Sequence, residues 1–533
     1  MERETRRSGV RGETASFWAG EYPLVKIFDY GSDVLIYDAK PHFAFIASRE
    51  ELACLTDFLQ GRPPSRPDAK LSVLRTKFSA LQKSGVFLKG PAAEISPVDD
   101  SAIRGQLQYF DENILLRKFC LEVTQNCNFR CTYCKRTLAQ DFRGHAAVDL
   151  SEADAYRAID YYFSRYTSFY GRLAADKREL LVRTVPPSLA FYGGEPFLNF
   201  LLIKKCVAYF KELPWQRYAI PNGALAFSSN TNLSVMNEDI LRFLVDNRVS
   251  LFASLDGPAP EHDRCRVFAD GRGTFAVAYE NLLKIQRFNA DYFRDNVSLF
   301  GVYTGRHDVA ACVSFTRGIG VLRCQHFPAE YSGIFVPDPA ADRVRYESAL
   351  ANDLADFRKK ALAASQAARP DMNDFAHLFP FAEVADDEPA GENALKLLAT
   401  CPMGFDNLMV AADGRFRICH KVDGAMPIGD SVTGLDFTRL ADVYRRYNET
   451  INNGACKSCW NVRFCGLCAA SRMKGDAFVN PTPEECDVLR LRTVYDFSCF
   501  IHLALEHPGL LTKIFDYRND RNSFIGIVDL HDF

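Results

Sequence analysis

The sequence lacks an excess of charge of either sign and lacks any long apolar run. Its 533 residues hold 64 Lys and Arg against 67 Asp and Glu, a balance that disfavours a dominant surface for nucleic acid or anionic membrane. No stretch approaches the roughly 20 consecutive apolar residues that span a bilayer. The polar, Arg-rich first residues also lack the apolar segment of a secretory signal. We therefore expect a cytoplasmic protein that binds neither nucleic acid nor membrane.

Cysteine, in contrast, is abundant. The composition is otherwise that of a well-packed globular protein, with 47% hydrophobic and 25% charged residues, and the length indicates about three domains. The 17 cysteines have little use as disulfides in a reducing compartment and more use as metal ligands. Their spacing therefore decides the class of function.

The N-terminal part is predicted to be a small α+β domain after a disordered tail at 1–16. Short apolar runs separated by turn residues predict a meander of strands. Ser48, followed by acidic residues, predicts a helix start. The expected elements are strands at 24–28, 34–37 and 42–46, a helix ending at Gly61 and a helix at 69–84, in a winged-helix-like domain over 17–90 followed by a linker over 91–114.

Apolar strands then alternate with longer helical segments. This alternation implies right-handed crossovers and a parallel sheet or partial barrel, with ligands at the carboxyl ends of the strands. The expected strands are 119–123, 189–192, 224–228, 250–254 and 297–302, and the helices are 151–166, 199–212, 235–247 and 273–288. We assign 115–335 to this α/β core, 336–398 to a helical bridge, 399–490 to a cysteine-rich domain and 491–533 to a C-terminal extension.

A C-x3-C-x2-C loop follows the first strand of the core, with Cys127, Cys131 and Cys134. Three thiolates on one short loop can hold three irons of a cubane cluster and leave the fourth iron open to a substrate or cofactor. Zinc fits less well, because a structural zinc site takes four ligands and no His lies in the loop.

With the aromatic Tyr133 before its last cysteine, this loop resembles the signature of the radical S-adenosylmethionine (SAM) enzymes. The resemblance implies a 4Fe-4S cluster on the three cysteines, with SAM bound to the open iron. It also implies cleavage of SAM to a 5′-deoxyadenosyl radical that takes a hydrogen atom from the substrate, and a partial (β/α)6 barrel as the fold.

Further segments resemble those of the same superfamily in the same order. Gly193, Gly194 and Glu195 form a G-G-E-P segment after the second strand, which a plain strand-to-helix turn would also explain. The T-N and S-L-D-G-P segments follow the third and fourth strands. The resemblance implies SAM contacts from Tyr133, Gly193, Gly194, Glu195, Asn232, Ser254, Asp256 and Arg266, although Asp256 could equally be a turn carboxylate that bonds to its own backbone.

The second field of cysteines resembles the SPASM extension of radical SAM enzymes. A zinc ribbon is the alternative for cysteines at C-x2-C spacing. The resemblance implies a first auxiliary 4Fe-4S cluster on Cys401, Cys419 and Cys468 and a second on Cys456, Cys459, Cys465 and Cys486, three clusters in all. Cys465 and Cys468 are one residue closer than in the family pattern. Leu395 stands where some relatives have a fourth ligand to the first auxiliary cluster, so we expect an open or non-cysteine position there.

The arrangement as a whole resembles the maturases of ribosomally made peptides. The resemblance implies that a precursor peptide adds a strand of its leader to the N-terminal domain, that flavodoxin or ferredoxin supplies electrons, and that the product is a thioether, ether or carbon-carbon crosslink. One alternative is an anaerobic sulfatase-type maturase that forms formylglycine on a protein. An alternative of another class is a non-catalytic zinc-ribbon scaffold that binds peptides.

Overall fold

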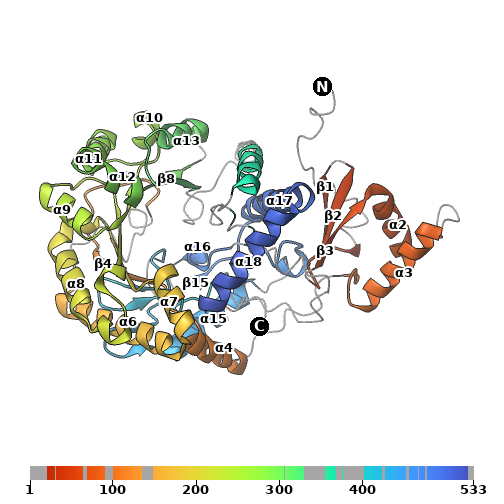
Figure 1. Ribbon diagram of the computed structural model, residues 1–533, viewed down its shortest axis with the longest axis horizontal. Helices are drawn as coiled ribbons and strands as arrows, with labels where there is room; N and C mark the ends of the chain where they lie inside the picture. Colours follow the sequence, from red (N-terminus) through yellow and green to blue (C-terminus); the bar gives the residue numbers. More distant parts are fainter. Residues whose placement is uncertain are drawn as a thin grey trace.

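The computed structural model contains two separate β-sheets of functional interest, one small and one large (Figure 1). It describes residues 21–30, 32–41, 43–63, 69–90, 100–134, 148–304, 307–328, 354–367, 375, 378, 401–422, 426–451, 455–465, 467–474 and 477–525. The expected tail at 1–16 and Leu395 lie outside these residues, as does most of the expected bridge.

The N-terminal module is a three-stranded antiparallel meander with two helices. Its strands are paired in the order β1-β2-β3. Ser48 caps the first helix, because its hydroxyl accepts from the amide of Glu51 while the Glu51 carboxylate accepts from the amide of Ser48. The elements are β1 (Val25–Tyr30), β2 (Asp33–Asp38), β3 (Phe43–Ser48), α2 (Arg49–Leu59) and α3 (Ala69–Lys83).

Six parallel strands in chain order form most of the large sheet, as the alternating pattern predicts for an α/β core. They are β4 (Lys118–Thr124), β5 (Ser188–Gly193), β6 (Ala226–Thr231), β7 (Ser250–Ser254), β8 (Val297–Tyr303) and β9 (Arg323–Pro328). The helices between them are α6 (Glu152–Arg172), α7 (Ala175–Thr184), α8 (Phe200–Glu212), α9 (Glu238–Asp246), α10 (Ala259–His262), α11 (Phe275–Phe288), α12 (Ala290–Asn296) and α13 (Val309–Arg317), with short 3-10 turns at Pro196–Asn199, Trp215–Tyr218 and Asn222–Ala224.

The cysteine-rich region adds two strands to the edge of this same sheet. β10 (Asn407–Val410) runs parallel to β4, and β11 (Phe416–Arg417) pairs antiparallel with β10. The region is therefore continuous with the core sheet. Its other elements are β12 (Gly429–Asp430), β13 (Gly434–Leu435), α15 (Phe437–Ile451), a 3-10 turn at Cys456–Ser458, α16 (Ala469–Arg472), β14 (Met473–Lys474), β15 (Ala477–Phe478), α17 (Pro483–Glu506) and α18 (Pro508–Ile525).

Several boundaries differ from those expected, and helix α6 extends to Arg172, six residues beyond its expected end. Helix α4 (Asp100–Asn113) occupies the expected linker, because Ile103, Leu107 and Phe110 recur at helical spacing and are buried. Helix α17 passes through the boundary expected at residue 490. Strand β6 begins two residues later than expected, since a 3-10 turn precedes it.

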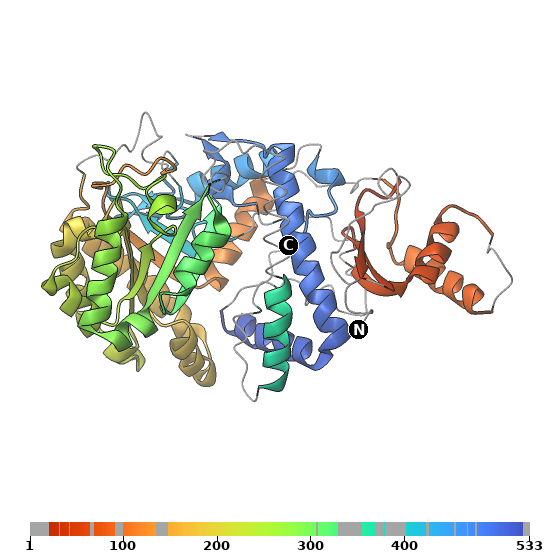
Figure 2. The same ribbon diagram turned by 90° about the horizontal axis from the view of Figure 1, so that it is seen from above.

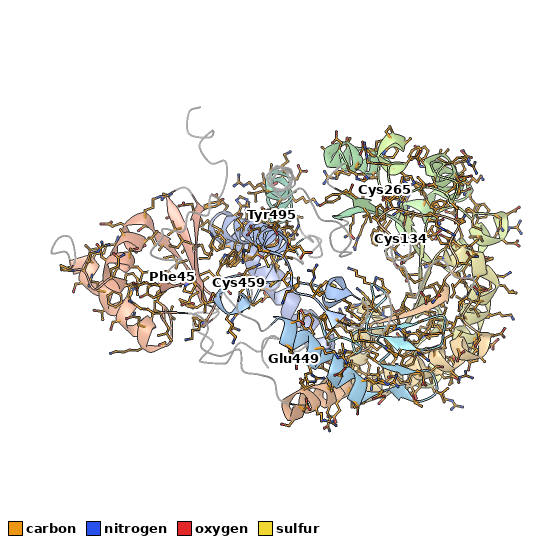
Figure 3. All side chains as sticks on the ribbon, turned by 180° about the vertical axis from the view of Figure 1, so that it is seen from behind. Phe45, Cys134, Cys265, Glu449, Cys459 and Tyr495 are labelled. Carbon is orange, nitrogen blue, oxygen red and sulfur yellow. The ribbon has the colours of Figure 1, made fainter. Side chains whose placement is uncertain are left out.

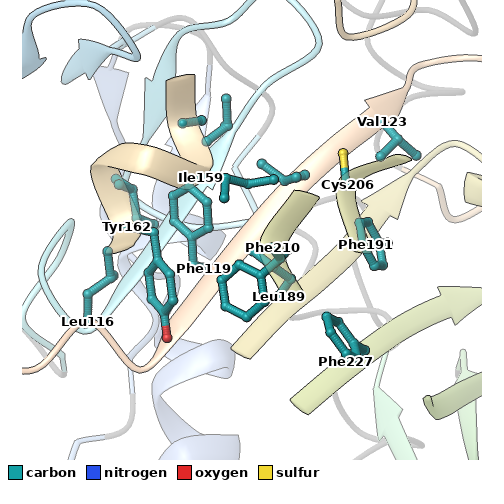
Figure 4. Close-up of a cluster of buried hydrophobic side chains, with 14 of the residues drawn as sticks. Leu116, Phe119, Val123, Ile159, Tyr162, Leu189, Phe191, Cys206, Phe210 and Phe227 are labelled. Carbon is teal, nitrogen blue, oxygen red and sulfur yellow. The ribbon is translucent and has the colours of Figure 1, made fainter. Parts of the chain in front are cut away.

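Alternation along β4 separates a helix-packed face from an inner face. Phe119, Leu121 and Val123 are fully buried in the core, where Phe119 stacks on Tyr162 of α6 with ring centroids 5.0 Å apart (Figure 4). Cys120 instead belongs to a small cluster with Met409. By this alternation, Cys120 and Glu122 lie on the face of β4 opposite to this core.

The N-terminal module docks against α17, and both views place α17 and α18 between the module and the large sheet (Figures 1 and 2). Phe28 of β1 stacks on Phe497 of α17 with centroids 4.3 Å apart. Tyr37 of β2 packs on the same ring at 5.2 Å. One face of the small sheet thus covers α17, and the opposite face packs on α2 and α3.

Candidate functional site

The predicted cysteine loop leaves the end of β4 and brings three thiols together. The thiols of Cys127, Cys131 and Cys134 lie close enough to influence one another electrostatically. Burial raises the pKa of Cys127 to about 11 and that of Cys131 to about 12. Thiolates at these positions therefore require a positive partner, as an iron cluster provides.

The neighbouring segment 265–267 fixes the loop from one side. The amide of Arg130 donates to the carbonyl of Val267 at 2.7 Å, and the amide of Thr132 donates to the carbonyl of Cys265 at 2.9 Å. Cys131 is thus held in place by backbone pairing of the residues on both sides of it.

Gly193 and Gly194 are required by close packing against the base of the loop. A Cβ at Gly194 would lie 2.1 Å from the carbonyl oxygen of Asn126, and one at Gly193 would lie 2.3 Å from that of Thr124. The amides of Gly194 and Glu195 donate to these two carbonyls. The two glycines therefore let the G-G-E-P segment pair with the chain that leads into the cysteines.

Glu195 is fully buried and ties β5 to β6. Its carboxylate accepts from the hydroxyl of Thr231 at 2.9 Å, the amide of Asn232 at 2.7 Å and the amide of Phe197 at 3.2 Å. Burial raises its pKa to about 7, and the three donors oppose that rise. Glu195 thus positions the ends of two strands beside the loop.

Asn232 reaches directly to the loop. Its Nδ2 lies 3.1 Å from the Oδ1 of Asn128 and 3.7 Å from the Sγ of Cys127. Asn232 therefore lies beside the cysteine loop, as predicted, with its side-chain amide directed at Cys127. Ser254 ends β7, two residues before Asp256.

Tyr133, Asp256 and Arg266 form one network, in which Asp256 and Arg266 are buried. The hydroxyl of Tyr133 donates to the Oδ2 of Asp256 at 2.6 Å, and the Nε of Arg266 donates to its Oδ1 at 3.0 Å. The guanidinium also lies over the Tyr133 ring. All three sequence-predicted residues are therefore brought together, and they satisfy one another.

Cys401, Cys419 and Cys468 form a second group of neighbouring thiols. Cys419 follows β11 and receives donors from the amide of Lys421 at 3.2 Å and from the Nδ2 of Asn407 at 3.8 Å. Such donors stabilise a thiolate, so the site suits a thiolate ligand.

Cys456, Cys459, Cys465 and Cys486 form a third group. The Nη2 of Arg490, one turn along α17 from Cys486, lies 3.8 Å from the Sγ of Cys459. In Figure 3, Cys459 lies on the side of the N-terminal module, whereas Cys134 lies in the core.

Among the described residues, no three Cys, His, Asp or Glu side chains converge closely enough to hold a single metal ion. In a cubane cluster each thiolate binds a different iron. No cysteine is in a disulfide. No described helix has the length and hydropathy needed to cross a membrane.

His420 is a site residue that the sequence reasoning missed. Its ring packs edge-on against Tyr192 of β5 with centroids 5.3 Å apart, and its Nδ1 lies 3.9 Å from the Sγ of Cys419. Burial lowers its pKa to about 4, so the imidazole is neutral. Its position directly after the motif residue Cys419 is the feature of the sequence from which it could have been predicted.

No family model matches the chain. It is 25% identical over 191 residues to the cysteine-type anaerobic sulfatase-maturating enzyme of Clostridium novyi (strain NT), over 34% of this chain and 43% of that enzyme. The match thus spans less than half of that relative's length.

Solved structures cover more of the chain. Native anSMEcpe with bound AdoMet and the Cp18Cys peptide has a TM-score of 0.50 at 16% identity, over 73% of this chain and 98% of that chain. Streptococcus suis SuiB bound to the precursor peptide SuiA has a TM-score of 0.41 at 12% identity, over 87% of this chain and 99% of that chain. The chain therefore shares the fold of native anSMEcpe, and over about a third of its length it is similar in sequence to the anaerobic sulfatase-maturating enzyme of Clostridium novyi (strain NT).

Proposed function

We propose that the chain is a radical SAM enzyme that modifies a ribosomally made peptide with the help of three 4Fe-4S clusters. The observation that carries the proposal is the convergence of the motif cysteines into three groups of thiols, one of which joins Cys401 and Cys468 from positions 67 residues apart (468 − 401 = 67). Neither a disulfide framework nor scattered core cysteines would produce this grouping.

Cys127, Cys131 and Cys134 would hold the SAM-binding cluster. Bound there, a 4Fe-4S cluster supplies the electron that cleaves SAM to methionine and a 5′-deoxyadenosyl radical, while auxiliary clusters take up the electron released when the substrate radical closes into product. The protein's own part is positioning. Glu195 fixes the ends of β5 and β6 beside the loop, and Asn232 points an amide at it.

The two C-terminal groups would hold the auxiliary clusters, Cys401, Cys419 and Cys468 the first and Cys456, Cys459, Cys465 and Cys486 the second. The first group has three thiols, so its fourth position is open or taken by a group other than cysteine. His420 lies beside it and against Tyr192, which precedes the G-G-E-P segment. The substrate would therefore lie between the cysteine loop and His420, on the inner face of the sheet.

The N-terminal module would bind the leader of the peptide at the edge of β3. Both faces of the small sheet are covered, and among the described residues no strand pairs with the outer edge of β3. A strand added there gains main-chain hydrogen bonds, and Ile46, which is 37% exposed, offers an apolar contact. Flavodoxin or ferredoxin would supply the electrons.

A second candidate is formation of formylglycine on a protein, as in the anaerobic sulfatase-maturating enzyme that the chain resembles. Both candidates use the same clusters and SAM. They differ in the substrate, since a leader-dependent reaction needs the edge of β3 and a sulfatase maturase does not.

The test is anaerobic reconstitution with iron and sulfide, with iron counting and detection of 5′-deoxyadenosine after addition of SAM and a strong reductant. Wild type is expected to hold about 12 irons, and a triple Ala variant of Cys127, Cys131 and Cys134 about 8, with nucleoside formed by wild type alone. Stoichiometric zinc and no 5′-deoxyadenosine would contradict the proposal of an enzyme. They would favour the alternative of a non-catalytic zinc-ribbon scaffold.

Leader dependence separates the two candidate substrates. Ile46→Lys places a charge at the edge of β3 and is expected to weaken binding of a cognate leader without lowering SAM cleavage. If wild type converts a substrate without a leader as fast as the same substrate with its leader, the result would favour the formylglycine reaction.

A further inference from the structure

In the network of Tyr133, Asp256 and Arg266, both carboxylate oxygens of Asp256 already accept hydrogen bonds from protein donors, and the residue is closed to solvent. Asp256 is 0% exposed. Its Oδ2 accepts from Tyr133, and its Oδ1 accepts from the Nε of Arg266 and, at 2.8 Å, from the amide of Val302. Both oxygens thus have protein donors, so the carboxylate holds neighbouring protein groups in place.

Arg266 is turned toward the cysteine loop. The side chain is 8% exposed, and its Nη1 lies 3.9 Å from the Sγ of Cys131. Arg264, two residues earlier, is 40% exposed and pairs with Glu261 at the surface. Of these two arginines, only Arg266 is buried, and it is the one that pairs with Asp256.

We propose that Arg266 is a positioning residue for the SAM-binding cluster, whose Cys131 sulfur it contacts through Nη1, instead of a ligand of the SAM carboxylate. Asp256 and Tyr133 hold the guanidinium in this place. The inference rests on the proposed function, because it requires a cluster on the loop. It replaces the role that the family resemblance implies for Arg266.

The consequence of this contact is a higher reduction potential for the cluster. A donor and a positive charge beside a thiolate ligand stabilise the reduced state, which carries one more electron. The guanidinium is charged at every accessible pH. Removal of Arg266 is therefore expected to lower the midpoint potential of the enzyme before SAM binds.

The experiment compares the reconstituted full-length protein with the variants Arg266→Gln, Arg266→Lys and the surface control Arg264→Gln. An EPR-monitored redox titration without SAM gives the midpoint potential of the cluster whose signal changes when SAM is added. Equilibrium binding of SAM is measured in parallel. We expect a lower potential in R266Q, partial recovery in R266K and no change in R264Q, with unchanged SAM affinity throughout.

R266Q leaves Asp256 as an unpaired buried charge and can lose iron or fold poorly for that reason. The double variant D256N/R266Q removes both charges together and keeps the test available. It is expected to retain wild-type iron content and still show a lowered potential, since Arg266 is the member of the pair in contact with the sulfur.

An unchanged potential in iron-replete R266Q or in the double variant overturns the inference. So does a rise of about tenfold or more in the SAM dissociation constant at constant potential, the size expected when a charge-assisted hydrogen bond to the ligand is lost. If wild type itself shows no SAM-responsive iron signal, the proposed function fails and the inference fails with it. The wild-type measurement therefore distinguishes the two failures.

Discussion

Arg463 donates from its Nε to the carbonyl oxygen of Ala39 at 2.7 Å, and its Nη2 donates to the carbonyl oxygen of Lys40 at 2.8 Å. The side chain is buried and lies between Cys459 and Cys465 in the sequence. Trp460 and Phe464, its neighbours in the same loop, pack on the rings of Phe28 and Tyr37. The small N-terminal sheet therefore rests on the loop that carries two cysteines of the third thiol group.

Arg463→Ala is expected to loosen the N-terminal module. The change removes two charge-assisted hydrogen bonds from buried carbonyl groups, a loss of about 2–4 kcal/mol in docking free energy. Hydrogen exchange of the amides in β1 and β2 should become faster, while exchange in β6 and β7 should stay as in wild type. Arg242→Ala, which removes an exposed ion pair with Glu238 on α9, serves as the control.

The same contact predicts a dependence of module docking on iron. A cluster bound to Cys459 and Cys465 would order the loop between them, and the ordered loop would hold the docked sheet more firmly. Reconstituted protein is expected to protect β1 and β2 from exchange better than iron-free protein. Equal protection in the two forms would show that the loop is already ordered without metal.

Gly194→Ala is expected to disrupt the cysteine loop. The added Cβ would lie 2.1 Å from the backbone oxygen of Asn126, which cannot move without shifting the chain into Cys127. On the proposed function, we expect loss of the iron assigned to Cys127, Cys131 and Cys134, about four per chain, and retention of the iron assigned to the C-terminal cysteines.

Gly223→Ala is the matched control, because a Cβ there meets nothing within 4 Å. It should reconstitute like wild type. Full iron content and SAM cleavage in G194A would contradict the close packing that we describe between the G-G-E-P segment and the end of β4.

Motif order predicted the site better than it predicted the contacts within it. Cys127, Cys131 and Cys134 follow β4, and the G-G-E-P segment and Asn232 follow β5 and β6, because consecutive βα units place their loops at one edge of a parallel sheet. The assignment of the cysteines to three clusters stays a prediction. The pairing of Asp256 with Arg266 was not predictable from spacing alone. The resemblance implies that both contact SAM, and only the structure shows that they contact each other.

Contacts between segments far apart in the sequence could not be predicted either. No local pattern announces that β10 joins β4, since that contact links residues nearly 290 positions apart (407 − 118 = 289). Helix α4 was interpreted as a linker although its apolar residues had helical spacing. Its partner α15 lies more than 300 residues further along the chain (437 − 113 = 324), so the face that it buries could not be assigned.

Asp496→Asn is expected to stabilise the protein at alkaline pH. Burial within α17 raises the pKa of Asp496 to about 7 from an unfolded value of 3.8, and Arg492, with its Nε 3.4 Å away, only partly opposes the rise. A carboxyl whose folded pKa is raised stabilises the fold while protonated, and that contribution is lost as the pH rises from about 4 through 7. Wild type should therefore unfold at a lower temperature at about pH 8 than at about pH 5.5, and D496N should reduce this difference.

At pH 8 the free energy of unfolding of D496N is expected to exceed that of wild type by about 1–2 kcal/mol. This is less than the whole pKa shift of Asp496 would give at ~1.4 kcal/mol per pKa unit, because solvent and Arg492 screen the charge. Thermal unfolding followed by circular dichroism at both pH values measures it. Asp295→Asn, at a surface position 56% exposed beside Arg294, should leave the pH difference unchanged. If D496N and wild type differ equally at the two pH values, the effect comes from packing of the amide in α17 and Asp496 is ionised throughout.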